Sequence, residues 1–418
     1  MSTLYNLGIH VMSLGAHVGA LHSPKLKLMI EGHRDSIARI LEARRKKAPQ
    51  GFDIWFHAAS LGEFEQARPI IEAYRKVRPD HTVLLTFFSP SGYTVRSNYP
   101  LADCVAYLPF DTPRAVCQFL DAARPRTAVF VKYEFWANFL GELHKRHVPC
   151  YLVSAIFRAS QPFFKPWGGM FRAMLGDFTH IFVQDETSAQ ILATVGCTNV
   201  TVAGDTRFDR VHKIMTDAPG VPAIEKWLSA DPDAFSMVVG SSWQPDEACY
   251  IPWLNAHPQC RAIVAPHEFD ESRLKALRAS ITGKSVLWSQ VKDSSEGIPA
   301  DTQVLVIDCF GLLSSIYRYG KVAIIGGGLG AGIHNINEAA VYGIPVAFGP
   351  NHQKFREALD LLDRGGAATY QNRAQLKAIL DRWLADSPAV SEAGRHCADY
   401  VRENLGATDT ILNHLLNN

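Results

Sequence analysis

Two glutamates of the first half follow stretches that predict buried strands. Glu63 comes after the apolar stretch Asp53 to Ala58 and the small turn Ala-Ala-Ser-Leu-Gly, and Glu134 comes after the stretch Thr127 to Lys132. Because the carboxyl ends of neighbouring parallel strands meet at one sheet edge, these two carboxylates can divide proton abstraction and positioning between them. A glutamate at a helix start can also do no more than complement the helix dipole, and the sequence leaves this alternative open.

The second half contains a glycine-rich segment between Lys321 and Pro350. Its pattern predicts a strand, a glycine loop, a helix that begins near His334, and another strand. The glycines at 326, 327, 328, 330 and 332 would let a ligand approach the backbone, and the helix start would aim free amides at a phosphate. Glu338, in the first turn, could bind ribose hydroxyls. The alternative is an acid that only complements the helix dipole.

Three further matches to known motifs are weak. Gly326, Gly328 and Ala331 fit G-x-G-x-x-A, but the next strand ends in Gly-Pro rather than in the acid that a dinucleotide fingerprint requires. Residues 283–285, Gly-Lys-Ser, follow a predicted helix instead of a P-loop strand. Residues 231–233, Asp-Pro-Asp, resemble a metal-binding D-x-D but stand in a proline-rich linker. We therefore expect no dinucleotide fingerprint at the first segment and no ligand at the other two.

The composition limits the classes of protein that need considering. The chain has 418 residues, 47% of them hydrophobic and 20% charged, which is typical of a globular protein with two domains. A net charge of +1 gives no electrostatic basis for binding nucleic acid. The 8 cysteines are scattered without C-x-x-C spacing, as expected of reduced thiols in a cytosolic compartment, and no structural zinc is expected.

From residue 52 onward, short β-branched or aromatic runs alternate with longer amphipathic stretches. This alternation predicts parallel sheets covered by helices. The fold class is therefore α/β, with two doubly wound Rossmann-like domains facing each other across a cleft that holds ligands at the carboxyl ends of both sheets. The expected strands are 53–58, 82–88, 104–108, 127–132, 150–154, 180–184, 200–203, 235–240, 261–265, 285–288, 303–307, 321–325 and 344–348.

We expect an N-terminal membrane-associated segment over residues 1–50, a first domain over 51–207, a linker over 208–234, and a second domain over 235–418. The second domain would end in one long helix over 389–416. The linker is placed where the pattern loses its regularity and prolines become frequent.

The N-terminal segment is uncharged and then basic. Residues 1–24 contain no Asp, Glu, Lys or Arg, and cations follow from Lys25 to Lys47. This order fits a helix in the bilayer interface, with its cations facing anionic headgroups. It equally fits an ordinary amphipathic helix packed on the domain. Aromatic residues and cations between Phe157 and Phe171 leave a similar choice between a lipid-contacting or acceptor-binding loop and a covered loop with its aromatics inward.

Taken together, these residues resemble the Kdo transferases of lipopolysaccharide biosynthesis, glycosyltransferases of the GT-B type. The resemblance covers nearly the whole chain. Asn337 replaces the leucine of the family's usual pattern, Tyr133, Phe135 and Ala137 are further departures, and two of the family's other short signatures are changed. The motifs that carry the resemblance are HAASLGE (57–63), FFSPSGY (87–93), YEFWAN (133–138), GDTRFDRV (204–211), GSSWQPDE (240–247), APHE (265–268) and HNINEAAVYGIPVAFGPN (334–351).

The resemblance implies an enzyme that transfers 3-deoxy-D-manno-octulosonate (Kdo) with inversion from CMP-Kdo to a lipid A precursor such as lipid IVA, at the cytoplasmic face of the bacterial inner membrane. Glu63 would be the general base, and Glu134 would orient acceptor or base. The leaving phosphate is a monoester that amides and cations can hold, so no metal or other cofactor is expected. The implied CMP pocket consists of Ser241, Ser242, Pro266, His267, Gly326, Gly327, Gly328, His334, Asn335 and Glu338.

Two other classes share the nucleotide pocket. A GT-B-like sugar-nucleotide epimerase or hydrolase would not need the N-terminal membrane segment. A non-catalytic, membrane-associated nucleotide-binding protein would tolerate the loss of Glu63.

Overall fold

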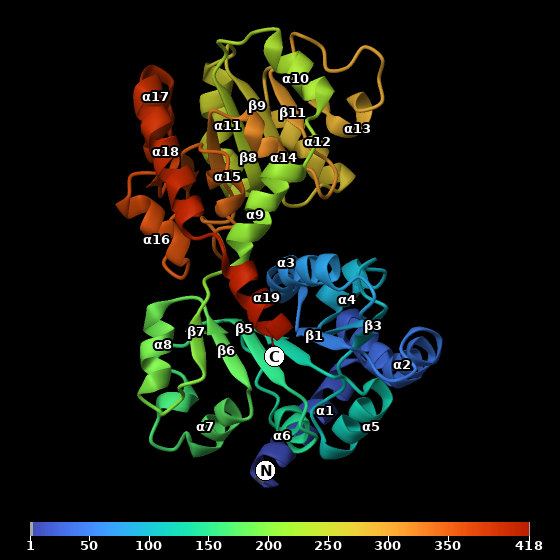
Figure 1. Ribbon diagram of the computed structural model, residues 1–418. Helices are drawn as coiled ribbons and strands as arrows, with labels where there is room; N and C mark the ends of the chain where they lie inside the picture. Colours follow the sequence, from blue (N-terminus) through green and yellow to red (C-terminus); the bar gives the residue numbers. More distant parts are fainter. Residues whose placement is uncertain (1–2, 418) are drawn as a thin grey trace. The chain divides into compact units, whose positions relative to one another are not determined.

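The computed structural model describes residues 3–417, which form two compact units (Figure 1). The first unit contains the residues up to 210 and those from 405 onward, and the second contains residues 211–404. Each unit is built around one parallel seven-stranded sheet with its own core.

The first sheet has the strand order β3-β2-β1-β4-β5-β6-β7. Almost every strand residue is buried, because helices cover both faces and leave the apolar, β-branched runs no contact with water. The winding changes direction between β1 and β4. The strands are β1 (Ile54–Ala58), β2 (Val83–Phe87), β3 (Cys104–Tyr107), β4 (Ala128–Val131), β5 (Cys150–Ala155), β6 (His180–Val183) and β7 (Val200–Val202).

Most helices of the first unit begin after a polar cap or a proline, as their sequences indicate. Ser23, for example, accepts a hydrogen bond from the Leu26 amide at the start of α2. The helices are α1 (Thr3–Gly19), α2 (Pro24–Lys47), α3 (Leu61–Val77), α4 (Pro90–Arg96), α5 (Pro113–Ala123), α6 (Ala137–Lys145), α7 (Gly169–Gly176), α8 (Glu186–Ala193), α9 (Thr206–Asp217), whose end belongs to the second unit, and α19 (Ala407–Asn417).

The second sheet has the order β10-β11-β9-β8-β12-β13-β14, and its winding changes direction between β8 and β12. The strands are β8 (Ser236–Ser242), β9 (Arg261–Pro266), β10 (Ser285–Leu287), β11 (Val304–Val306), β12 (Val322–Ile325), β13 (Val346–Phe348) and β14 (Ala367–Thr369). The helices are α10 (Pro222–Ser229), α11 (Gln244–Ala256), α12 (Glu271–Ser280), α13 (Trp288–Val291), α14 (Leu313–Ile316), α15 (Asn337–Ala340), α16 (Arg356–Asp363), α17 (Arg373–Ala385) and α18 (Ser387–Glu403).

The expected fold class, with two doubly wound parallel sheets, is confirmed, and every expected strand is present within a few residues. Only β14 lacks a counterpart among the expected strands. It has three residues, Ala-Ala-Thr, none of them fully buried, so it lacks the apolar run that marks the others.

The C-terminal part of the chain differs from the expected organisation. The single helix expected over 389–416 is two helices, α18 and α19, separated at Gly406, whose φ of +105° an α-helix cannot accommodate. Asp209 accepts hydrogen bonds from the amides of Gly406 and Thr408 at 2.8 and 2.7 Å, which fixes α19 in the first unit. The expected linker over 208–234 contains most of α9 and all of α10, whose first residue is Pro222.

Candidate functional site

The first unit places both expected carboxylates at the point where its winding changes direction. β1 and β4 are hydrogen-bonded neighbours, and the loops at their carboxyl ends lead to Glu63 and Glu134. In doubly wound α/β sheets, ligands bind at the carboxyl ends of the strands at this switch point. The expected positions of the two glutamates after neighbouring strands are therefore confirmed, and their role stays a prediction.

Glu63 is the third residue of α3 and is half-buried. Ser60, the N-cap, accepts from the Gly62 amide at 3.2 Å, and its hydroxyl donates to Oε2 of Glu63. The position complements the helix dipole, as the alternative interpretation holds, and it also leaves the carboxylate partly open to solvent.

Glu134 is held far more tightly. The residue is 8% exposed, and Oε2 accepts from Nε1 of Trp136 at 2.5 Å and lies 3.1 Å from Nε2 of His57. His57 lies in β1 and is completely buried, and its Nδ1 lies 2.9 Å from the hydroxyl of Thr86 in β2. Trp55 in turn donates to that hydroxyl at 2.8 Å. A continuous buried polar chain therefore fixes the position of Glu134.

Three further residues, Tyr133, Arg158 and Arg207, contribute to this edge. The sequence analysis included Arg158 only in a possible lipid-contacting or acceptor-binding loop and gave the other two no role. Burial raises the pKa of the Tyr133 hydroxyl, the nearby charge of Glu63 raises it further, and the charges of Arg158 and Arg207 lower it. Tyr133 is 39% exposed, and Arg207 is bonded to Asp205 at 2.8 Å. Only the fold brings these charges together, although the motif at 204–211 and the position of Arg158 were visible in the sequence.

The aromatic residues between 157 and 171 are mostly turned inward. Phe157 and Phe163 are buried in the core, where they contact Phe135. Trp167 is the exception, with 68% of its surface exposed. The covered-loop alternative thus holds for most of this cluster.

In the second unit, the expected pocket residues from β8, β9 and β12 lie side by side. The amide of His267 donates to the carbonyl of Ser242 at 2.9 Å, and the amide of Gly326 donates to the carbonyl of Gly240 at the same distance. Glycine is required at 326, because a Cβ there would lie 2.2 Å from the carbonyl oxygen of Ser241.

Backbone strain marks both switch points. Lys132 after β4 and Ser241 within β8 have positive φ values of 69° and 53°. Such conformations cost free energy in non-glycine residues and concentrate at functional sites. They therefore support a ligand site at each of these two strand ends.

The expectation of a helix that begins near His334 is wrong. α15 begins at Asn337 and is one turn long. The glycine loop before it hydrogen-bonds to the protein itself: the amide of Gly327 donates to Oδ2 of the buried Asp246 at 2.9 Å, and that of His334 donates to the carbonyl of Gly326 at 3.2 Å. The glycines serve close packing of this loop more than an open helix start.

Three aromatic rings form a column at this edge. The rings of Trp243 and His267 stack with centroids 4.3 Å apart, and those of His267 and His334 stack at 4.7 Å. Burial, with a smaller effect of His267, lowers the pKa of His334 to about 4, so its imidazole is neutral at pH 7. Nε2 of His334 accepts from Nε1 of Trp243 at 3.3 Å, which leaves the proton of this imidazole on Nδ1.

Glu338 is half-buried and already has partners within the protein. Oε2 accepts from the hydroxyl of Ser314 at 2.8 Å, and Oε1 accepts from Nδ2 of Asn335 at 3.3 Å. Oδ1 of Asn335 accepts from the amide of Asn337, so Asn335 also starts α15. A carboxylate has enough lone pairs to bind ribose hydroxyls as well.

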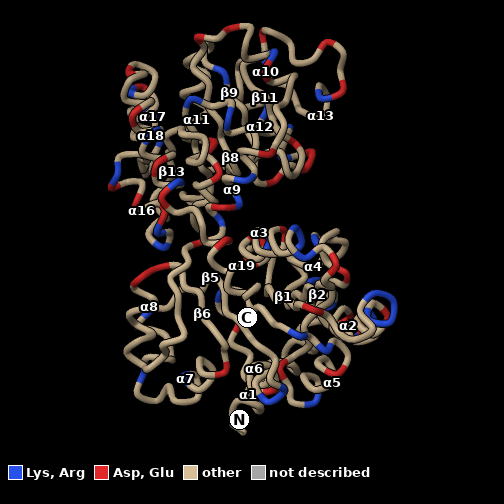
Figure 2. The backbone as a smooth tube through the Cα atoms, in the orientation of Figure 1, with Lys and Arg blue, Asp and Glu red and all other residues tan. Residues whose placement is uncertain are grey.

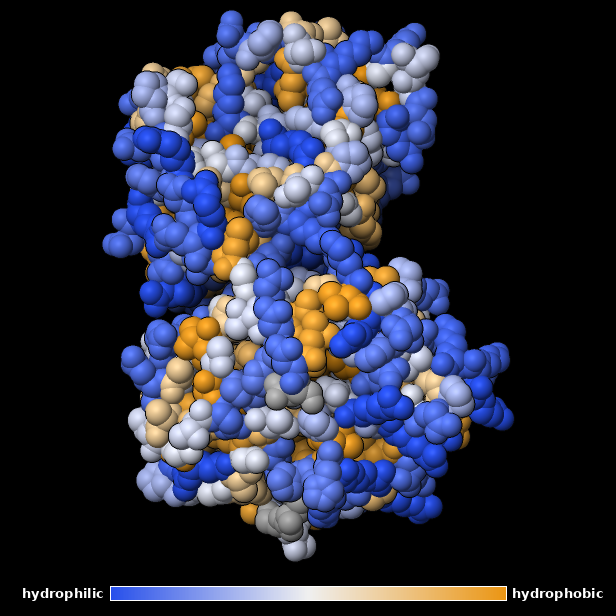
Figure 3. Space-filling model, in the orientation of Figure 1, coloured by the Kyte–Doolittle hydropathy of each residue, from blue (hydrophilic) through white to orange (hydrophobic). Residues whose placement is uncertain are grey.

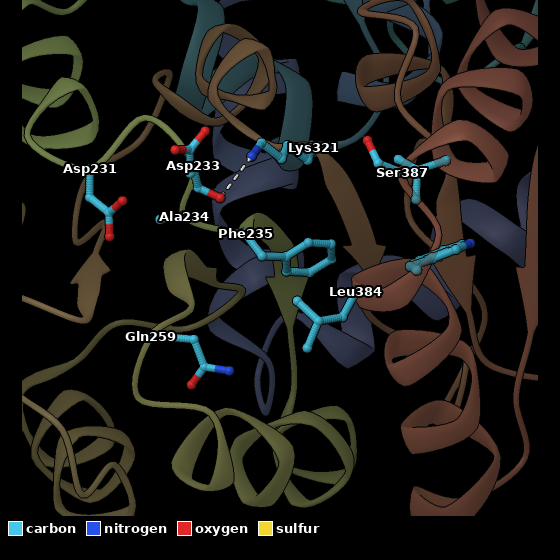
Figure 4. Close-up of a pocket in the computed structure, with 10 residues that line it drawn as sticks. Asp231, Asp233, Ala234, Phe235, Gln259, Lys321, Leu384 and Ser387 are labelled. Carbon is cyan, nitrogen blue, oxygen red and sulfur yellow. Dashed lines mark hydrogen bonds between the residues drawn. The ribbon is translucent and has the colours of Figure 1, made fainter.

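A cavity of about 500 Å³ lies elsewhere in the second unit (Figure 4). It is lined by Asp231, Asp233, Phe235 and Lys321, which precede β8 and β12, so it lies at the amino ends of these strands. Lys321 donates to the carbonyl of Asp233. Within residues 3–417, no three His, Cys, Asp or Glu side chains are grouped so that they could hold a metal ion.

Solved structures share this two-sheet architecture. UDP-GlcNAc 2-epimerase from Neisseria meningitidis, bound to UDP-GlcNAc, aligns with a TM-score of 0.61 at 13% identity, covering 87% of this chain and 100% of that chain. A putative UDP-N-acetylglucosamine 2-epimerase from Listeria monocytogenes gives a TM-score of 0.56 at 13% identity, covering 87% and 95%. At such low identity the likeness concerns the fold alone, and the class is the GT-B type with two Rossmann-like domains.

Sequence comparison finds similar proteins of known activity within this class. A family model described as 3-deoxy-D-manno-octulosonic-acid transferase (kdotransferase) matches residues 33–210. The 3-deoxy-D-manno-octulosonic acid transferase of Bordetella pertussis is 27% identical over 402 residues, covering 89% of this chain and 88% of the relative. That of Aquifex aeolicus is 25% identical over 340 residues, covering 79% and 86%. The chain thus resembles Kdo transferases over most of its length, and it is an enzyme of the glycosyltransferase class.

Proposed function

We propose that this enzyme transfers Kdo with inversion from CMP-Kdo to lipid IVA or a related lipid A precursor at the cytoplasmic face of the inner membrane. The observation that carries the catalytic assignment is the contrast between its two switch-point carboxylates: Glu63 is half-buried and partly open to solvent, whereas Glu134 is 8% exposed and bonded to His57 and Trp136. Glu63 is suited to accept a proton, and Glu134 is suited to orient groups around it.

An acceptor hydroxyl is a weak nucleophile at neutral pH. Glu63 removes its proton as the hydroxyl attacks the anomeric carbon of Kdo, and the CMP phosphate leaves from the opposite side, which gives inversion. The guanidinium groups of Arg158 and Arg207, which act on Tyr133 beside Glu134, supply positive charge for anionic groups of the acceptor or for the Kdo carboxylate.

The donor nucleotide belongs to the second unit. We assign CMP to the carboxyl ends of β8, β9 and β12, with the ribose hydroxyls at Glu338 and the neutral His334 donating from Nδ1. The leaving group is a monoester whose charge these groups can share, so transfer needs no divalent metal. Undiminished turnover in EDTA would agree with this assignment, and loss of turnover restored by Mg²⁺ would contradict it.

The membrane contact is assigned to the outer face of α1. Leu4, Leu7, Val11, Leu14 and Val18 are each more than half exposed, and their spacing of three and four residues aligns them in one stripe, which we call the outer stripe. Apolar atoms reach the surface beside the N-terminal end of the chain in Figure 3. None of the helices within residues 3–417 combines the length and apolarity needed to span a bilayer.

Positive charge follows the outer stripe in sequence. α2 packs on α1 and has Arg44, Arg45, Lys46 and Lys47 in its last turn, where Figure 2 shows a blue cluster. Apolar insertion together with attraction to anionic headgroups is the usual way in which interfacial helices bind. The glycosyltransfer would then occur where its lipid acceptor resides.

The reaction is tested by mixing the purified chain with CMP-Kdo and lipid IVA and determining the mass of the lipid. We expect an increase of one or more Kdo residues, and a product without Kdo would contradict the proposal. Membrane binding is tested by sedimentation with phosphatidylglycerol vesicles. The double change Leu7→Gln and Leu14→Gln should release the protein, as high salt partly should, whereas Leu359→Gln, an exposed leucine of the second unit, should not.

The alternative activities are less well supported. The epimerases share the fold at 13% identity, but the named relatives that align over most of the chain are Kdo transferases. A protein that only binds a nucleotide would not need Glu63 as a base. Formation of free Kdo or of an altered CMP-sugar, without a lipid product, would favour the hydrolase or epimerase alternative.

A further inference from the structure

The inner face of α1 contacts the segment that carries Glu134. The hydroxyl of Tyr5 donates to Oδ2 of Asp111 at 2.6 Å and accepts from the amide of Ala137 at 3.2 Å. Oδ1 of Asn6 accepts from Nδ2 of Asn138 at 2.8 Å. Two consecutive residues near the chain's N-terminus thus hold the start of α6, 132 residues away.

α6 depends on these contacts because it has no local cap. The residue before it, Trp136, makes no side-chain hydrogen bond to the first amides of the helix, which need acceptors from elsewhere. Tyr5 serves the first amide, and Asp111 serves the next two, those of Asn138 and Phe139, at 2.9 Å each. Without Tyr5 and Asp111 the start of α6 would lose its hydrogen bonds in a buried environment.

The same short segment controls Glu134. Trp136 donates to Oε2 of Glu134, and its ring packs in a small cluster with Ile9 of α1, Met29 of α2 and Phe110. A shift of the start of α6 would therefore move the indole that holds the carboxylate.

We propose that Tyr5 and Asn6 are positioning residues for Glu134. Through these two residues, a lipid surface beneath the outer stripe stabilises the productive position of the Glu134 carboxylate. The inference rests on the proposed function, in which the outer stripe binds lipid and Glu134 serves the acceptor. Ile9 is the only residue of α1 that is fully buried, so α1 has little packing of its own. Lipid that buries the outer stripe favours the state in which α1 is docked. Docked α1 in turn favours the ordered segment 133–139, because Tyr5 and Asn6 hydrogen-bond to that segment.

Amide hydrogen exchange of the full chain tests this coupling, with and without phosphatidylglycerol vesicles. We expect the vesicles to slow exchange both in residues 3–19 and in residues 133–139. Tyr5→Phe should make exchange in 133–139 about tenfold faster, the effect of one lost hydrogen bond to a charged group, and should remove the slowing by vesicles there. Tyr99→Phe is the matched control, because the Tyr99 hydroxyl is buried in the same unit without a hydrogen-bond partner.

The transfer reaction gives the second readout. Tyr5→Phe and Asn6→Ala should lower kcat and reduce the stimulation of turnover by vesicles, while KM for CMP-Kdo and the melting temperature stay close to those of Tyr99→Phe. If the vesicles slow exchange in residues 3–19 but leave exchange in residues 133–139 unchanged, the coupling is overturned. Unchanged exchange in both segments would show that the membrane role of α1, and the coupling with it, is wrong. A Tyr5→Phe protein stimulated as strongly as the parent would also overturn the inference.

Discussion

Nε2 of His57 lies 3.1 Å from Oε2 of Glu134, although 77 residues separate them in the chain. The parallel pairing of β1 with β4 brings them together, and both side chains are buried. A buried carboxylate is costly unless it is hydrogen-bonded, so its partners determine its position. His57, the first residue of the HAASLGE motif, therefore belongs to the site as a residue that positions Glu134.

His57→Phe should lower turnover roughly a hundredfold, because it removes one of the two groups that hold Glu134 and small displacements of positioned groups carry costs of that order. It should also lower stability, since the Thr86 hydroxyl loses its ring partner. Steady-state transfer to lipid IVA, corrected for folded protein by circular dichroism, measures the effect. Turnover close to the parent value would show that His57 is structural only.

Glu63→Gln keeps the side-chain shape and removes the base. We expect transfer to fall by roughly a hundredfold to ten-thousandfold, with CMP-Kdo binding and the melting temperature nearly unchanged. A purely structural first-turn acid would instead cost about 0.3 to 1 kcal/mol of stability and leave turnover normal. Glu271→Gln, at the first turn of α12, is the matched control and should leave turnover at the parent value. Transfer by Glu63→Gln at close to the parent rate would refute the proposed mechanism.

The sequence predicted the sheets and both switch-point carboxylates because these are local patterns. A buried apolar run, a small turn and an amphipathic helix identify the strand end, and the acid at that end follows directly, as at Glu63. The charges around Tyr133 could not be found in this way. Arg158 follows β5 and Arg207 lies at the start of α9, and only the order of the strands brings their charges to this edge.

The errors at the start of α15 and at the C-terminus have a different physical cause. The pattern after Gly332 predicted a helix from His334, but the loop's hydrogen bonds to Asp246 and to its own carbonyls keep the backbone irregular until Asn337. Gly406 lies within an amphipathic stretch, and its positive φ is stabilised by the distant Asp209. Tertiary hydrogen bonds override local propensity at both positions.

Glu338→Ala should weaken CMP binding by about 1.5 to 3 kcal/mol if its carboxylate accepts the ribose hydroxyls. Ser314→Ala removes only a hydrogen bond that orients the carboxylate, so it should weaken binding less. Calorimetric titration with CMP compares the three proteins. Equal affinity in Glu338→Ala, together with a lower melting temperature, would show that Glu338 serves only to start α15.

Asn337→Leu should stabilise the second unit. The Asn337 side chain is completely buried, and neither its amide nitrogen nor its oxygen has a hydrogen-bond partner. Each such group costs about 1 to 3 kcal/mol, and leucine, the residue of the family's usual pattern, has the same branched arrangement of non-hydrogen atoms. Urea unfolding should show a higher midpoint, whereas Asn335→Leu, which loses real hydrogen bonds, should show a lower one. A lower midpoint for Asn337→Leu would reveal a polar partner at this position.

Asp111 should give the first unit a stability that depends on pH near 6. Burial raises the pKa of this carboxyl to about 6, above its ordinary value, against the opposing hydrogen bonds from Tyr5 and the amides of Asn138 and Phe139. The folded state therefore binds this proton more tightly than the unfolded state does. The free energy of unfolding contributed by this carboxyl must then fall as pH rises from about 4 to about 6, by on the order of 3 kcal/mol in total.

Asp111→Asn removes that titration and keeps one oxygen as an acceptor for the start of α6. Other acids titrate in both proteins, so the quantity to follow is the difference in melting temperature between parent and variant at pH 5 and at pH 7. We expect the parent to lose stability relative to Asp111→Asn as the pH is raised across this range. A constant difference would mean that Asp111 stays ionised throughout, because its hydrogen bonds from Tyr5 and α6 offset the effect of burial on its pKa.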